Sequence, residues 1–219
     1  MKKMEQKENK KIKVIGLGGS GCSIVHYLES NYRFNDNVKI IGSDSAICGM
    51  KFCKNKLPLA RVYPMFLKVR NILENDSKQL NDIMCCIGCN GNKTLGEYSA
   101  FCKYDEIKNE LEGVDILILT TVLGGGTGSG AIKRFVMIAQ ELGINVYCMV
   151  SKPCGFFGKK YMDIAEESIS ELLKINGEVI ECDIFDEKLK KIPKYLESGN
   201  INMSKKIVET FLNEYIIND

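Results

Sequence analysis

The sequence lacks an excess of charge of either sign, a long apolar run and more than one histidine. Its 30 basic and 28 acidic residues give a formal net charge of +2, so no overall field attracts nucleic acid or an anionic membrane. No apolar stretch approaches the roughly 20 residues that a membrane-spanning helix needs. The lone His26 has no neighbour in sequence with which to form a catalytic dyad. We therefore expect neither nucleic-acid binding, nor membrane insertion, nor histidine-based catalysis.

Cysteine, in contrast, is abundant, with ten in 219 residues. The first ten residues are polar and lysine-rich without an apolar segment behind them, so they do not resemble a secretory signal. We expect a disordered polar tail over residues 1–11, a cytoplasmic protein and reduced thiols. Only Cys86 and Cys89 have metal-like spacing, short of the two ligand pairs of a structural zinc site. We predict no protein-held metal and no side chain in a catalytic role.

Strands and helices are predicted to alternate along the chain. Residues 12–15 form a strand that runs into glycines and a helix through residue 28, and residues 38–41 form a second strand. Helical spacing covers residues 65–83. Beyond Gly113 we predict strand 114–122, helix 129–142, strand 145–150, helix 159–174, strand 178–183, and helical stretches near 187–197 and 203–217. This pattern indicates an α/β fold: a parallel sheet with helices on both faces and ligands at the carboxyl ends of its strands.

A glycine-rich run, Gly124–Gly130, follows the strand at 114–122 and opens a helix. Five glycines in seven positions let main-chain N–H groups approach a ligand closely. The strand before and the helix after aim those groups, and the positive end of the helix dipole, at one point. Thr127 and Ser129 add hydroxyl donors. The run is therefore predicted to hold a phosphate chain.

A second glycine loop, Gly16–Gly21, fits the G-x-G-x-x-G dinucleotide fingerprint, and Asp44 closes the next strand where a ribose-binding acid would lie. A NAD-type Rossmann oxidoreductase or sensor is therefore one interpretation. That fingerprint does not explain the second loop at Gly124–Gly130, and no catalytic constellation accompanies it. A P-loop NTPase is disfavoured because G-x-x-x-x-G-K-[ST] is absent. Two phosphate loops favour a different mononucleotide fold.

Four segments carry a resemblance to the nucleotide-binding domain of the tubulin and FtsZ family. Gly124–Gly130 resembles the family signature G-G-G-T-G-[ST]-G, and Ile12–Gly21 resembles FtsZ's opening strand and first phosphate loop. Gly88–Gly96 looks like the glycine-rich loop near the terminal phosphate, and Val150–Met162 is similar to the ribose-side loop with its helix. The resemblance covers nearly all of residues 12–219.

The resemblance implies a Rossmann-like three-layer GTP-binding domain, with GTP or GDP and Mg²⁺ at the carboxyl edge of the sheet. The phosphates would lie on the amides of the two glycine loops. The full set of predicted cofactor-binding residues is Gly18, Gly19, Ser20, Gly21, Cys22, Asp44, Asn90, Gly91, Asn92, Gly125, Gly126, Thr127, Gly128, Ser129, Pro153, Phe157, Asp186 and Glu209.

The sequence departs from the family at the sugar and base ends of this site. Phe157 and Tyr161 occupy positions where the family commonly has Glu and Arg, so two polar contacts to the sugar are missing. Asp186 falls where FtsZ usually has Asn, and Glu209 falls near the family's guanine-reading Asp. Lys205 takes the place of the aromatic residue that stacks on the base.

In the family, the core helix leads into a loop with two acidic residues and then a second domain, and that loop completes the site of the next subunit along a filament. This sequence ends at Asn218-Asp219, so we expect one domain over residues 12–219, ending after the core helix and lacking the second domain. Without these acidic residues to orient and deprotonate the attacking water, we expect the rate of hydrolysis to be lower by a factor of about 10² to 10⁴.

The expected function is therefore that of a divergent GTP-binding protein of the cytoskeleton or of cell division. It would be a weak or partner-dependent GTPase, and its partner a second copy or an FtsZ-like filament. The NAD-type reading and a non-binding structural or regulatory scaffold stay open as alternatives.

Overall fold

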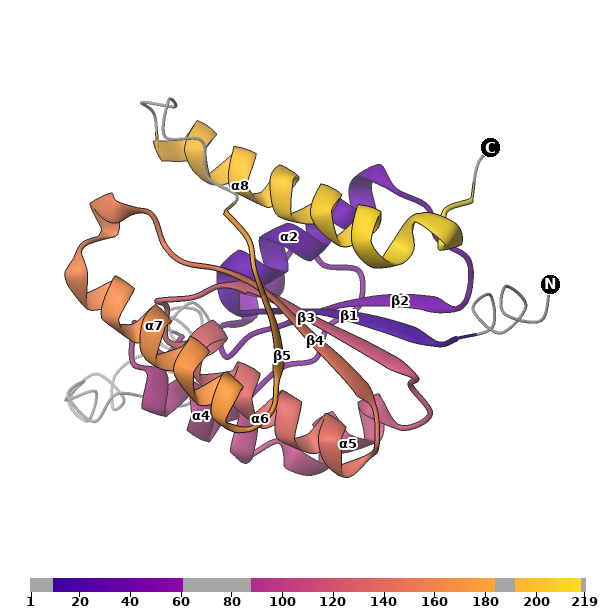
Figure 1. Cartoon of the computed structure of the whole chain (residues 1–219), viewed down its shortest axis with the longest axis horizontal. Coiled ribbons are helices and arrows are strands. Elements are labelled where there is room, and N and C mark those ends of the chain that lie inside the picture. Colours follow the sequence, from indigo (N-terminus) through magenta and orange to yellow (C-terminus); the bar gives the residue numbers. More distant parts are fainter. Residues whose placement is uncertain (1–9, 61–87, 184–191, 218–219) are drawn as a thin grey trace, which may run out of the picture.

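A parallel sheet of five strands organises the part of the chain that the computed structural model describes, which is residues 10–60, 88–183 and 192–217, with 192–195 as backbone only. Its strands are β1 (Ile12–Leu17), β2 (Val38–Ser43), β3 (Ile116–Val122), β4 (Asn145–Ser151) and β5 (Glu178–Glu181). Their order across the sheet is β2-β1-β3-β4-β5, and every pair is parallel (Figure 1).

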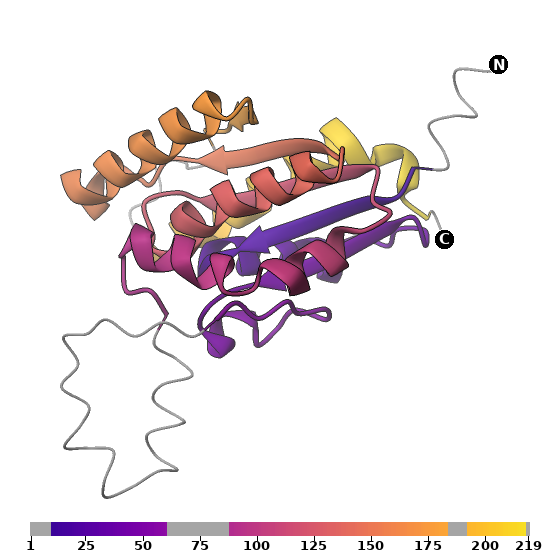
Figure 2. The same cartoon turned by 90° about the horizontal axis from the view of Figure 1, so that it is seen from below.

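Helices cover both faces of this sheet. They are α2 (Gly18–Asn31), α4 (Lys93–Phe101), α5 (Tyr104–Leu111), α6 (Thr127–Glu141), α7 (Lys159–Lys174) and α8 (Ile192–Ile207). Helices α2 and α8 lie together on one face, and α4 to α7 lie on the other (Figures 1 and 2). The predicted fold class, a parallel sheet between two helical layers, is confirmed.

The strands are apolar on both sides because each face is covered. Successive side chains of β1 point to opposite faces: Ile15 and Leu17 join the core beneath α4 to α7, whereas Ile12 and Val14 pack beneath α2 and α8. All four are at most 1% exposed. A strand buried on both faces reads as a continuous apolar run, which is why the sequence signalled these strands.

Both edges of the sheet limit further strand pairing. At the β2 edge, the Gly42 N–H donates to the Asn55 carbonyl at 3.0 Å, and the Leu57 N–H donates to the Gly42 carbonyl at 2.9 Å. At the other edge, β5 is only four residues long and has Glu178 and Glu181 at its ends. Short, charged or covered edge strands give a second chain little to pair with.

Several elements differ from the sequence prediction. Helix α2 already begins at Gly18, so the first glycine loop forms its first turn. The two stretches predicted near the C-terminus are one helix, α8, which continues through a π-helical turn at Val208–Leu212 and a 3₁₀ turn at Asn213–Tyr215. Helices α4 and α5 were not predicted. None of the helices described has the length and apolar character needed to cross a membrane.

Some predictions concern residues outside the described part of the chain. These are most of the expected tail, residues 1–9, the helix expected at 65–83, the thiol of Cys86 and the expected base contact Asp186.

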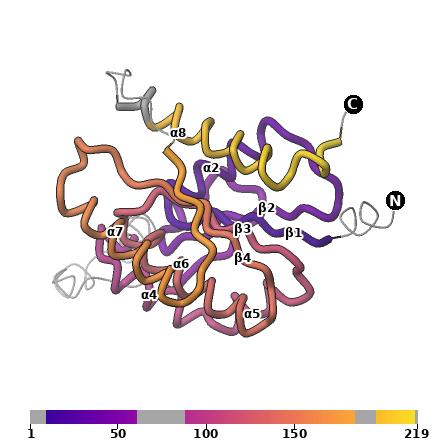
Figure 3. Tube along the Cα trace, viewed as in Figure 1, coloured from indigo at the N-terminus to yellow at the C-terminus, as the bar shows by residue number. Residues whose placement is uncertain are grey.

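The connection from β1 to α2 brings the site to the surface. Figure 3 follows β1 into α2 and shows β1 between β2 and β3. At this turn the backbone folds so tightly that a Cβ on Gly16 would overlap the Gly21 carbonyl oxygen and lie 2.8 Å from Val25 Cγ1. A Cβ on Gly21 would lie 2.5 Å from the Thr120 carbonyl oxygen of β3. Glycine at these positions lets the first turn of α2 rest directly on two strands.

We predict that Gly16→Ala lowers the free energy of unfolding by about 2–4 kcal/mol, because the new methyl group forces backbone apart rather than a flexible side chain. Denaturant unfolding monitored by circular dichroism measures this loss. The control is Gly155→Ala, where a Cβ would meet nothing within 4 Å and where we expect a change within about 0.5 kcal/mol. Equal stability of the two variants would contradict the packing argument.

Candidate functional site

The two glycine loops touch each other at the carboxyl ends of β1 and β3. Gly18 has a φ of 69°, and a Cβ on it would lie 2.9 Å from the Gly128 backbone nitrogen. A Cβ on Gly128 would lie 3.0 Å from the Leu17 carbonyl oxygen. The sheet register pairs Gly16 with Thr120, so the helices that follow the two strands begin side by side. Sequence reasoning predicted both loops, and the structure brings them together.

Neither helix that begins here has a side-chain cap or an acidic residue in its first turn within the described structure. The first N–H groups of a helix have no partner inside the helix, and the helix dipole makes that end positive. In α2 these groups belong to Gly18–Ser20, and in α6 they belong to Thr127–Ser129, because the Gly130 N–H already donates to the Gly126 carbonyl at 3.1 Å. Two uncapped helix N-termini that converge on one place form a binding site for an anion.

Hydroxyl groups beneath the loops fix their geometry. The Thr121 hydroxyl donates to the Leu17 carbonyl at 2.8 Å. The Ser20 hydroxyl accepts from the Val122 N–H at 3.1 Å, and the Ser129 hydroxyl accepts from the Gly124 N–H at 2.8 Å. Ser129 is 1% exposed. The Ser20 side chain thus holds the first loop to β3, and the Ser129 side chain fixes the shape of the second loop from within.

Asp44, which follows β2, reaches the same region. Its side chain is 5% exposed, and burial raises the pKa of the carboxyl, while hydrogen bonds from Ala46, Thr127 and Ser45 act to lower it. The Ser45 hydroxyl lies 2.8 Å from the Thr127 hydroxyl. A Cβ on Gly49 would overlap Asp44 Oδ2. The site therefore holds one buried carboxylate beside the start of α6.

The glycine loop at residues 88–92 packs against the loop before α6. Asn90 and Gly91 have φ angles of 46° and 72°, and the Asn92 side chain caps α4 by accepting from the Leu95 N–H at 3.1 Å. A Cβ on Gly126 would lie 2.9 Å from the Asn92 nitrogen. The predicted segment Asn90–Asn92 is therefore beside the phosphate loops, although the Asn92 amide oxygen already serves the helix.

A cavity of about 350 Å³ opens from the glycine loops toward α7 and α8. Its walls are Gly19, Ser20, Ser23, Val122, Leu123, Gly125, Pro153, Phe157, Tyr161, Leu196 and Asn200. The ring centroids of Phe157 and Tyr161 are 6.0 Å apart, so one wall is aromatic. The predicted residues Pro153 and Phe157 line this cavity.

Other predicted residues stand apart from the cavity. Glu209 is in the π-helical turn after α8, and its charge acts on Tyr32, which lies at the end of α2 away from Gly18. Cys22 directly follows the first turn of α2, but its side chain is buried and its thiol donates to the Gly16 carbonyl at 3.8 Å. The structure does not bring Glu209 to the loops.

The residues of α8 that do reach the cavity, Leu196 and Asn200, were missed by sequence reasoning, as was Tyr161 from the list of binding residues. Leu196 and Asn200 lie one helical turn apart and so share a face. The signal available was this spacing, which Met203 and Ile207 continue along the same face of α8; both are 0% exposed and packed in the core.

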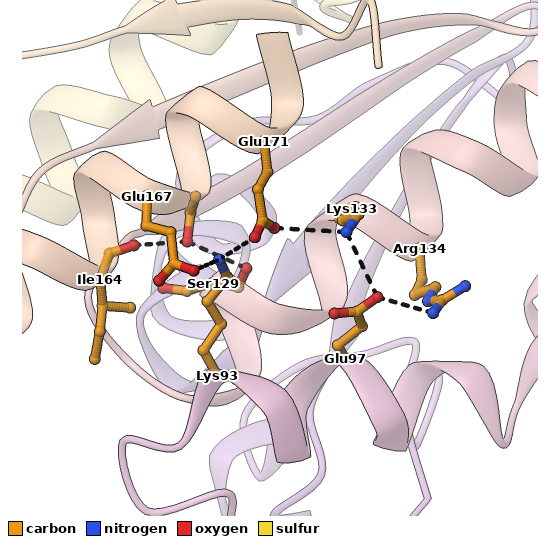
Figure 4. Close-up of polar contacts among 9 residues, drawn as sticks. Lys93, Glu97, Ser129, Lys133, Arg134, Ile164, Glu167 and Glu171 are labelled. Carbon is orange, nitrogen blue, oxygen red and sulfur yellow. Dashed lines mark hydrogen bonds and ion pairs between the residues drawn. The ribbon is translucent and has the colours of Figure 1, made fainter. Parts of the chain in front are cut away.

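An ionic cluster joins α4, α6 and α7 behind the glycine loop at 88–92 (Figure 4). Lys93, the first residue of α4, pairs with Glu171 at 2.9 Å and with Glu167 at 3.4 Å. Lys133 pairs with Glu171 at 3.7 Å and with Glu97 at 3.8 Å. Arg134 pairs with Glu97 at 2.8 Å.

Lys93 is the most enclosed member of the ionic cluster, with a side chain 12% exposed. Burial acts to raise the pKa of Glu171, but the hydrogen bonds and charges of Lys93 and Lys133 outweigh it and hold that pKa below its usual range. Since Lys93 directly follows Asn92, this cluster fixes where the glycine loop stands.

Two glycine loops, two open helix N-termini and a cavity beside them at the carboxyl end of a parallel sheet define a mononucleotide-binding α/β domain. A family model described as the GTPase domain of the tubulin/FtsZ family matches residues 11–192. The chain belongs to the tubulin/FtsZ family. The resemblance read from the sequence is thereby confirmed, and the NAD-type alternative is not favoured.

Related sequences agree with this assignment. The chain is 34% identical over 168 residues to the cell division protein FtsZ of Coxiella burnetii, covering 75% of this chain and 38% of that protein. It is 33% identical over 163 residues to the cell division protein FtsZ of Pseudomonas aeruginosa, covering 74% and 36%. The chain thus spans less than half the length of these relatives.

Solved structures show the same fold. An empty FtsZ dimer of M. jannaschii matches with a TM-score of 0.74 at 21% identity, over 99% of this chain and 60% of that one. A GTPgS-bound protofilament of CetZ2 from Haloferax volcanii matches with a TM-score of 0.70 at 16% identity, over 95% and 60%. TubZ of the Clostridium botulinum phage c-st matches with a TM-score of 0.65 at 15% identity, over 95% and 63%.

For the ionic cluster, we predict that Glu171→Gln lowers the free energy of unfolding by about 1–2 kcal/mol at pH 7. The substitution removes the negative charge nearest to the enclosed Lys93 ammonium, which then keeps only the longer ion pair with Glu167. Since the folded-state pKa of Glu171 is lowered, its contribution is complete above about pH 5 and is lost as the pH falls below about 4. Urea unfolding across that range measures the difference from the unmodified protein.

The matched control is Glu167→Gln on the same helix. That side chain is 62% exposed and its ion pair is longer, so we expect a change of less than about 0.5 kcal/mol at every pH. A larger loss for Glu167→Gln than for Glu171→Gln would refute the ranking of the two pairs.

Proposed function

We propose that the chain binds GTP and GDP at the junction of its two glycine loops. The observation that carries this proposal is the convergence of two uncapped helix N-termini beside a cavity of about 350 Å³. The phosphates rest on the N–H groups of Gly19–Gly21 and Gly126–Gly128. Family membership supports guanine over other bases.

The nucleoside extends from the phosphates along the cavity. Its sugar lies against Pro153, Phe157 and Tyr161, where the described walls offer ring faces and not charged groups. Its base lies toward α8, where Asn200 supplies an amide that both donates and accepts hydrogen bonds. Asp186 stays a proposed base contact outside the described residues. We withdraw Glu209 from that role, because it lies beside Tyr32.

Mg²⁺ accompanies the nucleotide in this proposal, which revises the expectation from the sequence that no side chain holds a metal. The donor set fits a hard cation, because Asp44 offers a buried carboxylate and Thr127 a hydroxyl beside the phosphate loops. The ion would neutralise phosphate charge. Burial raises the pKa of the Asp44 carboxyl because it disfavours the charged form. A cation there would also balance that negative charge.

We further propose that hydrolysis by this chain alone is slow and that a second copy or an FtsZ-like filament partner supplies the acids that orient the attacking water. No described residue at the loops stands as a general base, because Asp44 is enclosed by Ala46, Ser45 and Thr127. The setting is a cytoskeletal or cell-division filament in the cytoplasm. The scaffold alternative would require that no nucleotide binds.

To test nucleotide binding we predict the effect of Gly125→Val. A Cβ on Gly125 meets nothing within 4 Å and stands on a wall of the cavity, so the valine occupies ligand space without disturbing the fold. We expect at least tenfold weaker GTP binding by isothermal titration calorimetry, with little change in melting temperature.

The matched control for Gly125→Val is Gly155→Val, which is equally unhindered but does not line the cavity, and it should bind GTP like the unmodified protein. If the unmodified protein gives neither bound nucleotide after purification nor any heat or thermal shift with GTP and Mg²⁺, the proposed function is wrong and the scaffold alternative is supported.

For Asp44→Asn we predict two opposite effects. The nucleotide-free protein should melt at the same or a slightly higher temperature, because a charge disfavoured by burial is removed while the oxygen that accepts from the Ala46 N–H is kept. The gain in GTP affinity on adding Mg²⁺ should fall about tenfold.

Calorimetric titrations with and without Mg²⁺ measure this gain for Asp44→Asn. Asp115→Asn serves as the control, because that carboxylate lies just before β3, at the end of the strand away from the loops, where it accepts from the Lys11 N–H. Unchanged Mg²⁺ dependence in Asp44→Asn would exclude Asp44 from the ion site.

A further inference from the structure

A second cavity, of about 290 Å³, lies beside α2 and shares Ser23 and Asn200 with the first cavity. Two cysteines from separate parts of the chain line it: Cys22, just after the first turn of α2, and Cys53, in the segment that follows the 3₁₀ turn Ile47–Met50. His26, whose ring centroid is 5.4 Å from that of Phe52, lines it too. The proposed nucleotide function makes no use of either thiol.

The absence of a side chain at Gly42 leaves space in which the two sulfur atoms lie close together. A Cβ on Gly42 would overlap Cys53 Sγ and would lie 3.2 Å from Cys22 Sγ, so both sulfurs share the space that the missing side chain leaves beside β2. Cys53 Sγ also donates to the Cys22 carbonyl oxygen at 3.5 Å. Both cysteines are at least 95% buried, with exposed fractions of 1% and 5%.

The two thiols differ in exposure and in chemical character. Cys53 is 5% exposed against 1% for Cys22, so an oxidant that enters the cavity reaches Cys53 first. The neighbouring Cys22 side chain lowers the pKa of Cys53, against the opposing effect of burial, whereas the Cys53 side chain and burial raise the pKa of Cys22. Since the thiolate is the reactive form of cysteine, we assign Cys53 as the nucleophile and Cys22 as the resolving thiol beside it. This asymmetry is typical of redox-active cysteine pairs.

We propose that Cys22 and Cys53 form a peroxide-sensitive dithiol site whose oxidised state is an intramolecular disulfide between α2 and residue 53. The cavity that both cysteines line, of about 290 Å³, has room for an oxidant of the size of hydrogen peroxide. The pairing rests on the shared position of the sulfurs at Gly42, and it is independent of whether the neighbouring loops bind nucleotide.

The oxidation balances with peroxide as the sole oxidant. The Cys53 thiolate attacks one peroxide oxygen, the O–O bond breaks, and hydroxide leaves and takes up a proton as water. The Cys22 sulfur then attacks the sulfenic sulfur of Cys53, the S–O bond breaks, and a second water leaves with the Cys22 proton. Two thiols are oxidised to one disulfide while one peroxide is reduced to two waters.

The disulfide would tie α2, just after the first turn whose N–H groups form half of the proposed anion site, to the segment that hydrogen-bonds to the edge of β2. A covalent link across 31 positions restricts the unfolded chain. We therefore expect the oxidised protein to melt roughly 5 °C higher than the reduced protein.

The test is brief treatment of the purified full chain with hydrogen peroxide, followed by alkylation and non-reducing peptide mapping by mass spectrometry. We expect a peptide that joins Cys22 to Cys53, with the loss of two hydrogens, reversed by dithiothreitol. Burial raises the pKa of Cys148 to about 12, so that thiol should stay unoxidised. Sulfinic acid at Cys53 with no Cys22–Cys53 peptide, or linkage of either cysteine elsewhere, would overturn the proposal.

Variants assign the two roles. In Cys22→Ala, the sulfenic acid of Cys53 should persist and be trapped by dimedone, whereas in Cys53→Ala oxidation at Cys22 should slow at least tenfold. Cys48→Ser, which alters an exposed cysteine of the neighbouring 3₁₀ turn, should form the Cys22–Cys53 disulfide like the unmodified protein. The peptide map of the unmodified chain decides the pairing even where a variant folds poorly; faster trapping at Cys22 than at Cys53 would reverse the roles.

Discussion

The approach of two backbones to within van der Waals contact is the constraint on which this structure depends. Gly18 and Gly128 face each other at a separation that leaves no room for a Cβ, and Gly21 rests on the Thr120 carbonyl of the neighbouring strand. Only glycine permits this contact. Because the loops meet, two helix N-termini point at one place, and that convergence gives the domain its capacity to hold a polyanion.

The rest of the site keeps this contact in position. Threonine and serine hydroxyls fasten the loops to β3, and the ionic cluster around Lys93 fixes the loop at residues 88–92 against the start of α6. Each of these groups bonds to the protein's own backbone or to side chains of neighbouring helices. Ligand contact is thus left mainly to main-chain N–H groups, which depend little on side-chain identity. The aromatic wall of the neighbouring cavity, formed by Phe157 and Tyr161, can therefore vary without altering the glycine loops.

Much of the fold and the meeting of the two glycine loops could be predicted from the sequence, because both depend on local patterns. Doubly buried strands appear as apolar runs, and glycines mark close approaches of the backbone. The part of the cavity that α8 forms could not be predicted. The position of α8 is set by tertiary contacts, such as the Ser204 hydroxyl donating to the Ile24 carbonyl at 3.0 Å, and these select which face of the helix meets the cavity. Hence Leu196 and Asn200 line it, and Glu209 does not.

The edges of the sheet have a consequence for association between molecules. Residues Asn55–Leu57 hydrogen-bond to the Gly42 end of β2, and β5 is short with a glutamate at each end, so neither edge favours lengthening of the sheet strand by strand. Association of the described part of the chain is therefore favoured through side-chain surfaces. Such contacts can be broken and remade without disturbing the core, unlike the strand-to-strand growth of amyloid.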